Sequence, residues 1–137
     1  ASGAIQRSAP EARMILADTS VWIDHLRRPD RRLSAVLAAN VVLVHPFVIG
    51  ELACGALPNR ATLLAELSAL PHAPVVAHAE VLGFLARYAL GGRGVGWIDV
   101  HLLASAMLAG RAQLWTRDRR LHVIAVELGI ATPKVTR

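Results

Sequence analysis

The residues Met14-Ile15-Leu16-Ala17-Asp18-Thr19 form the first element of the chain and set the interpretation of the rest. The four apolar residues predict a short buried strand, and a helical pattern runs from Thr19 to Leu26. Asp18 lies where the strand gives way to the helix. A buried carboxylate is costly unless it is paired or bound to a metal, so Asp18 is a candidate functional residue.

Three other carboxylates also lie in apolar surroundings. Glu51 and Asp99 are each the single charge of a long uncharged segment, and Asp118 follows the apolar run that ends at Trp115. Each acid also has an ordinary explanation. Asp18 suits a helix N-cap, Asp99 a first helical turn and Asp118 a turn that bonds its own backbone, while Glu51 could lie on a surface.

Taken together, the four acids predict a metal site. Two carboxylates about 5 Å apart repel by roughly 3 kcal/mol at an effective dielectric near 20, so a cluster needs cations. Ligands that are all oxygen select a hard ion, Mg²⁺ or Mn²⁺, and one or two ions are compatible with four acids. The six histidines lack zinc-like spacing, and we expect structural or surface roles for them.

Apolar strands alternate with helical patterns along the chain, which favours an α/β fold with a central parallel sheet of four to five strands. Ligands bind at the carboxyl ends of such strands, so the four acids can meet at one edge. The strands are expected at residues 14–17, 41–44, 75–76 and 113–116, and the helices at residues 19–26, 34–39, 46–57, 60–70, 78–88, 98–109 and 119–128.

The length of 137 residues suits a single domain with a real core. Hydrophobic residues make up 54% and the mean hydropathy is +0.43, which excludes a disordered chain. Residues 1–13 are small and polar and suggest an expression-tag remnant, with Met14 as the native start of a domain over residues 14–137. The single cysteine, Cys54, permits no intrachain disulfide, and a reducing cytoplasm fits.

The net charge of +5 comes almost entirely from arginine, because Lys134 is the only lysine. Arginine binds phosphate with a bidentate fork, so a nucleic-acid partner is one interpretation, and codon bias in an arginine-rich genome is the other. The arginines nearest the acids are candidate RNA contacts, with a solvated charged face as the alternative. They are Arg93, Arg117, Arg119 and Arg120.

Four segments resemble the acidic motifs of the PIN domain, and specifically of the VapC-type toxins of bacterial toxin–antitoxin pairs. They are Leu16-Ala17-Asp18-Thr19-Ser20-Val21-Trp22, Ile49-Gly50-Glu51-Leu52, Trp97-Ile98-Asp99-Val100-His101-Leu102-Leu103-Ala104 and Trp115-Thr116-Arg117-Asp118-Arg119-Arg120-Leu121. The resemblance extends from Met14 to about Thr132. The order and spacing of the motifs make it fairly specific, although each motif alone is loose.

The resemblance implies a three-layer α/β sandwich and a metal-dependent endoribonuclease toxin that uses metal-activated water. Asp18 and Asp99 would be the principal Mg²⁺ ligands, Asp118 would complete the cluster, and Glu51 would bind a second ion or orient water. Ser20 and Thr116 would support these ligands through their hydroxyl groups. The family also implies a homodimer, a VapB-like antitoxin that holds the toxin inactive, and contact with operator DNA only through the antitoxin complex, with no membrane association.

Two other functions remain open from the residues alone. A module that binds RNA or protein without cutting would use the arginines, and the acids would then be caps and turns. An aspartyl-phosphate protein would need a lysine near the phosphoryl group, and only Lys134 is available.

Overall fold

The computed structural model describes residues 13–133. Of the expected tag remnant only Arg13 falls in this range, so that interpretation, and Met14 as the native start, stay predictions. Arg13 donates from Nε to the carbonyl oxygen of Arg111 at 2.9 Å, which attaches the start of the described chain to the fold.

Three strands in the described range form one parallel sheet in the order β2-β1-β3. They are β1 (Ile15–Ala17), β2 (Val42–Leu43) and β3 (Gln113–Trp115). Leu16 of the central strand pairs with Leu43 on one side and with Leu114 on the other. All three strands therefore end at the same edge of the sheet, from which the chain passes into helices.

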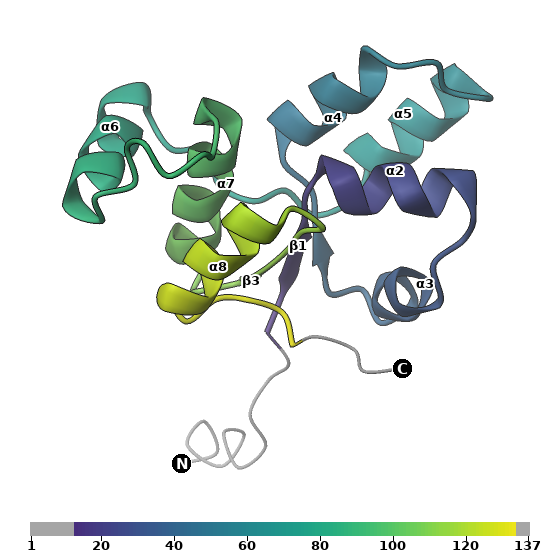
Figure 1. Ribbon diagram of the computed structural model, residues 1–137. Helices are drawn as coiled ribbons and strands as arrows, with labels where there is room; N and C mark the ends of the chain where they lie inside the picture. The colour runs from purple at the N-terminus through teal and green to yellow at the C-terminus, as the bar shows by residue number, and fades with distance from the viewer. Residues whose placement is uncertain (1–12, 134–137) are drawn as a thin grey trace, which may run out of the picture.

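Helices cover both faces of the sheet and give three layers (Figure 1). Figure 1 places α2, α3, α4 and α5 on one side of the strands and α6, α7 and α8 on the other. The bounds of these helices are Thr19–Arg27, Arg31–Ala38, Pro46–Ala53, Arg60–Ser68, His78–Arg87, Trp97–Leu108 and Arg119–Glu127, in chain order from α2 to α8.

Side-chain caps fix where four of these helices begin. Asp18, Asp30 and Asp118 each accept a hydrogen bond from a backbone N–H three residues on, at 3.2, 2.8 and 3.0 Å. His45 begins α4 in the same manner, because its Nδ1 accepts from the Phe47 N–H at 3.0 Å. These bonds satisfy amide groups that have no partner inside the helix, so the sequence determines the helix starts locally.

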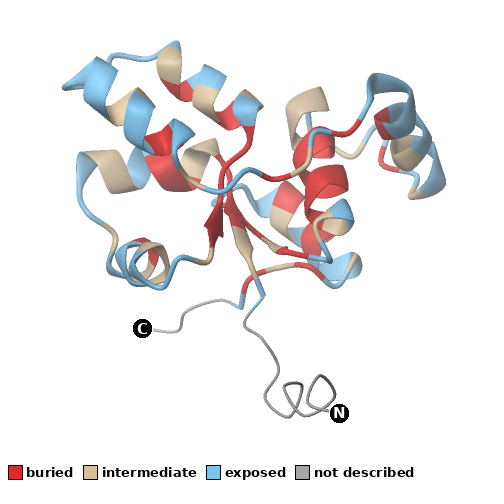
Figure 2. Cartoon of the chain, turned by 180° about the vertical axis from the view of Figure 1, so that it is seen from behind, coloured by how far each residue is buried: buried red, intermediate tan, exposed pale blue. Residues whose placement is uncertain are grey.

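The core lies around the strands and α7 (Figure 2). Seven consecutive residues of α7, from Val100 to Ala106, are buried, as expected for a helix that carries no charge after its first turn. Trp22 and Trp115 belong to this core, so their rings pack against the interior of the fold. No helix in residues 13–133 is long and apolar enough to cross a membrane.

The parallel three-layer arrangement is as predicted, but the sheet edges differ from the expected four to five strands. Beyond the three strands, the described chain adds only isolated parallel bridges, Val44 with His72 and Leu114 with Ala131. The predicted strand at Val75–Val76 is wrong. The pairing occurs earlier, where the Ala73 N–H donates to the Val44 carbonyl at 2.8 Å.

Two helix ends also differ from prediction. Helix α4 ends at Ala53 rather than near Leu57, and α5 ends at Ser68 rather than Leu70. Asn59 precedes α5 as expected but makes no side-chain cap bond, because it adopts the left-handed conformation with φ 48°. The N-cap conformation that aims a side chain at the first amides is extended.

Candidate functional site

Asp18 follows β1 directly and is 6% exposed. Its Oδ1 caps α2 and also accepts from the Ser20 hydroxyl at 2.5 Å, while Oδ2 accepts from the Thr116 hydroxyl. Burial raises the pKa of this carboxyl, although these hydrogen bonds oppose the shift. Asp18 is therefore an N-cap and at the same time a buried acid held by two hydroxyl groups.

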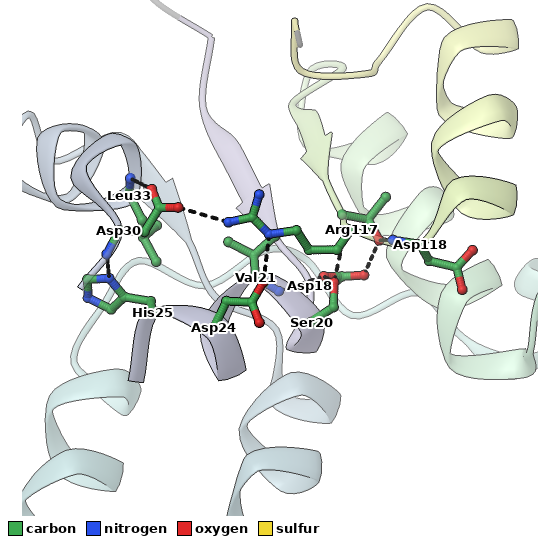
Figure 3. A network of polar contacts seen from close by, with 10 residues as sticks. Asp18, Ser20, Val21, Asp24, His25, Asp30, Leu33, Arg117 and Asp118 are labelled. Carbon is green, nitrogen blue, oxygen red and sulfur yellow. Dashed lines mark hydrogen bonds and ion pairs between the residues drawn. The ribbon is translucent and has the colours of Figure 1, made fainter. Parts of the chain in front are cut away.

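Ser20 and Thr116 link the ends of β1 and β3, strands that are far apart in sequence. The Ser20 hydroxyl accepts from the Arg117 N–H at 2.9 Å, and the Thr116 hydroxyl accepts from the Asp118 N–H at 2.9 Å. Thr116 is buried and thus lies between Asp18 and Asp118. Both hydroxyls also donate to the Asp18 carboxylate, and Figure 3 shows Ser20 beside Asp18 and Arg117.

Asp99 lies in the first turn of α7, and its Oδ2 accepts from the Gly96 N–H at 3.1 Å. Burial is the largest cause that raises the pKa of Asp99, and the charges of Asp18, Asp118 and Glu51 raise it further. Like charges act in this way only at short range. The fold therefore brings all four acids to one region.

Glu51 and Asp118 are the exposed members of this acidic cluster, which we define as Asp18, Glu51, Asp99 and Asp118. Glu51 accepts from the Thr19 hydroxyl at 2.5 Å. Thr19 was missed by sequence reasoning. It lies between Asp18 and Ser20 within the first motif, and that position was the only available signal.

The cluster suits a hydrated hard cation better than an ion enclosed by protein. Within residues 13–133, no three His, Cys, Asp or Glu side chains are arranged to hold a metal ion as they stand. Mg²⁺ usually takes one or two carboxylates and keeps several waters, so it does not require such a group. Four carboxylates fit that ion, and the charges of three of them raise the pKa of the fourth, Asp99.

Two of the four candidate RNA-binding arginines are already paired. Arg93 forms a bidentate ion pair with Glu127, at 2.7 and 2.8 Å, which ties the loop of residues 91–96 to α8. Arg117 pairs with Asp24 at 3.0 Å and with Asp30 at 2.8 Å (Figure 3). These contacts give both arginines a structural role, while Arg119 and Arg120 stay exposed beside Asp118.

Asp24 and Asp30 are the acids whose positions the sequence did not predict. Asp24 is exposed and Asp30 lies in the turn between α2 and α3, and both face Arg117. Burial alone would raise the pKa of Asp30, but the Leu33 N–H and Arg117 outweigh it and lower that pKa. No local pattern reveals this pairing, because Asp30 and Arg117 are 87 residues apart.

Replacing Thr116 by valine is expected to lower the free energy of unfolding by about 2 kcal/mol. Valine keeps the shape but removes the hydroxyl, so the Asp118 N–H loses its partner and buried Asp18 loses a donor. Urea denaturation would measure the loss, and Thr116→Ser, which keeps the hydroxyl, should recover most of it. Equal stability of the valine variant would show that the link contributes nothing.

Comparison with known proteins assigns the chain to a family. The family model described as the PIN domain matches residues 15–127. The chain is 49% identical over 118 residues to Ribonuclease VapC32 of Mycobacterium tuberculosis, in strains CDC 1551 and H37Rv, and the match covers 86% of this chain and 95% of that protein.

A solved structure supports the fold independently. The crystal structure of PAE2754 from Pyrobaculum aerophilum superposes with a TM-score of 0.53 at 19% sequence identity, and the match covers 87% of this chain and 98% of that one. At that identity the likeness concerns the fold alone. The family match spans all four acids of the cluster and most of the chain. The chain therefore belongs to the PIN domain family.

Proposed function

We propose that the protein is a Mg²⁺- or Mn²⁺-dependent endoribonuclease of the VapC kind, the toxin of a toxin–antitoxin pair. The observation that carries the proposal is the placement of Asp18, Asp118 and Glu51 near Asp99, whose pKa is raised by burial and further by these three charges. The 49% identity to a protein named Ribonuclease VapC32 supports the choice of RNA as substrate. The alternatives are a module that binds without cutting and an aspartyl-phosphate protein. The second alternative needs a lysine, and Lys134 lies outside the described residues.

Asp18 and Asp99 are the principal metal ligands in this proposal, with Asp118 and Glu51 completing the site. When bound, one or two ions would activate water and neutralise charge on the scissile phosphodiester. The residues of the chain prepare the site. Ser20 and Thr116 hold the Asp18 carboxylate in one orientation, and Thr19 does the same for Glu51. Such support keeps ligands in place before substrate arrives.

The partners follow from the same proposal. A VapB-like antitoxin would neutralise the toxin in the cytoplasm, the toxin would form a homodimer, and operator DNA would be contacted only through the antitoxin complex. Co-expression of the chain with the small protein encoded beside its gene, followed by gel filtration, tests for the complex.

The proposed activity requires that RNA cleavage depend on added divalent ions. We expect the purified protein to cut single-stranded RNA with Mg²⁺ or Mn²⁺ and to stop in EDTA. Because an ion bound only to the folded state stabilises it, the same ions should raise the free energy of unfolding by about 2.7 kcal/mol at a concentration of 100 times Kd. A rise in the melting temperature would report this stabilisation. RNA binding without cleavage across the ion series would favour the binding module instead.

A further inference from the structure

The hollow beside the acidic cluster is rich in arginine. Its volume is about 1270 Å³, and it is bounded by the turn between α2 and α3, by the loop after β3 and by the start of α8. Thr116 and Asp118 form part of its wall, so it is continuous with the acidic cluster. We call it the arginine groove. Its arginines are Arg27, Arg28, Arg31, Arg32, Arg117 and Arg119.

The acids of the groove leave half of its arginine charge uncompensated, because Asp24, Asp30 and Asp118 stand against six arginines. The groove also contains Asp24 and Asp30, but both are committed to Arg117. Arg28, Arg31 and Arg119 are exposed, and they form no ion pair with any of the described residues. A solvated face of mixed charge would pair its arginines with nearby acids. Here the paired acids instead hold the turn in place, and the other arginines repel one another.

Aromatic surface is almost absent from the groove. Trp115 is 5% exposed, and the guanidinium of Arg32 lies 4.8 Å from the centre of its ring. Burial, and next the charge of Arg117, lower the pKa of Arg32, whereas Asp30 raises it. Apart from the half-buried His122, the groove therefore presents charge with little aromatic surface, which favours phosphate contacts over base recognition.

We propose that the arginine groove binds the RNA backbone on one side of the scissile bond, through its phosphates and without reading sequence. Arg28 and Arg31 are the central contacts, and the Arg117 ion pairs with Asp24 and Asp30 position the turn that carries them (Figure 3). This inference rests on the proposed function, because it assigns to the groove the same RNA that the acidic cluster would cut.

The test is RNA binding by the full chain as a function of salt, with EDTA present so that no cleavage occurs. The probe is a labelled single-stranded RNA of mixed sequence, and the variant is Arg28→Gln with Arg31→Gln. Each lost phosphate contact lowers the slope of log K against log salt by about 0.7. We expect a slope lower by about 1.4 and an affinity lower on the order of 10-fold at physiological salt.

The matched control removes the same charge elsewhere. Arg60 and Arg87 are exposed and lie on α5 and α6, outside the groove. Arg60→Gln with Arg87→Gln should leave the salt slope at its wild-type value. Equal slopes for the groove and control variants would overturn the inference.

The outcomes separate this inference from the proposed function. If the wild-type protein never cleaves RNA, the proposed nuclease activity is contradicted. Loss of RNA affinity by the groove variant in EDTA would still support RNA binding by the arginine groove. If the wild type cleaves but the groove variant binds RNA normally, the groove inference fails alone. Polyglutamate is the second probe. If the groove variant loses polyglutamate binding while its RNA binding is unchanged, the groove binds an acidic protein segment, and the RNA assignment is overturned.

Discussion

Replacing Asp99 by asparagine is expected to lower the rate of RNA cleavage by at least about 100-fold, because a lost metal ligand costs several kcal/mol of transition-state stabilisation. Asparagine keeps the size of the side chain and an oxygen that can accept from the Gly96 N–H. Only the negative charge is removed. Cleavage of RNA with saturating Mn²⁺ measures the effect.

Stability separates a chemical role for Asp99 from a structural one. Asp18, Asp118 and Glu51 all disfavour the charged form of Asp99, so its neutralisation should leave the free energy of unfolding in EDTA unchanged or higher. Glu80→Gln is the matched control, because Glu80 is also a first-turn acid, on exposed α6. A cleavage rate for Asp99→Asn equal to that of Glu80→Gln would contradict the assignment of Asp99 as a ligand.

The stability of the metal-free protein is expected to fall by about 3 kcal/mol as the pH drops from about 6.5 to about 4, through His45. His45 is fully buried, and burial is the largest cause that lowers its pKa from 6.5 to about 4, followed by the charges of His101 and His72. Its Nδ1 must stay unprotonated to accept from the Phe47 N–H. Protonation would therefore remove the cap of α4.

The direction follows from proton uptake. Between pH 6.5 and 4 the unfolded chain binds a proton at His45 that the folded chain does not, so acid favours unfolding. The contribution is fully present above pH 6.5 and is lost as the pH falls through the folded pKa. Asp18 and Asp99 act in the opposite direction near the foot of this range, because the folded state raises their pKa.

A matched variant isolates His45 from those carboxyls. Asparagine is a good N-cap and does not titrate, so His45→Asn should keep α4 while losing most of the slope between pH 6.5 and 4. Urea denaturation at a series of pH values in EDTA measures both proteins. A slope in His45→Asn as steep as in the wild type would assign the acid sensitivity to other groups, with His101 as the next candidate because burial lowers its pKa also.

Local chemistry made the three strands and most helix starts predictable. Met14 to Ala17 is apolar and ends at an acid, and the same arrangement recurs before Asp118. Asp18 and Asp118 were each considered as a cap or turn residue and as a cluster member, and each is a cap within the cluster. Parallel strands end at one edge, so the convergence of the acids followed once the strands were placed.

The misplaced edge of the sheet has a physical cause. Val75–Val76 has the composition of a strand, but pairing depends on which backbone groups lie beside β2. His72 and Ala73 reach Val44 first. Strand propensity describes a side chain that suits a pleated surface and carries no information about which segment reaches the sheet edge.

The sequence by itself determined the fold class and the family and predicted the four acids as one cluster, because periodicity, cap chemistry and motif order are local properties. Only the tertiary structure decided which charges pair. Arg117, a candidate RNA contact, pairs with Asp24 and Asp30, and Arg93 pairs with Glu127. Ion pairs form between side chains that folding brings within a few ångströms, at separations of 34 and 87 residues for Glu127 and Asp30. No periodic pattern spans such distances along a chain.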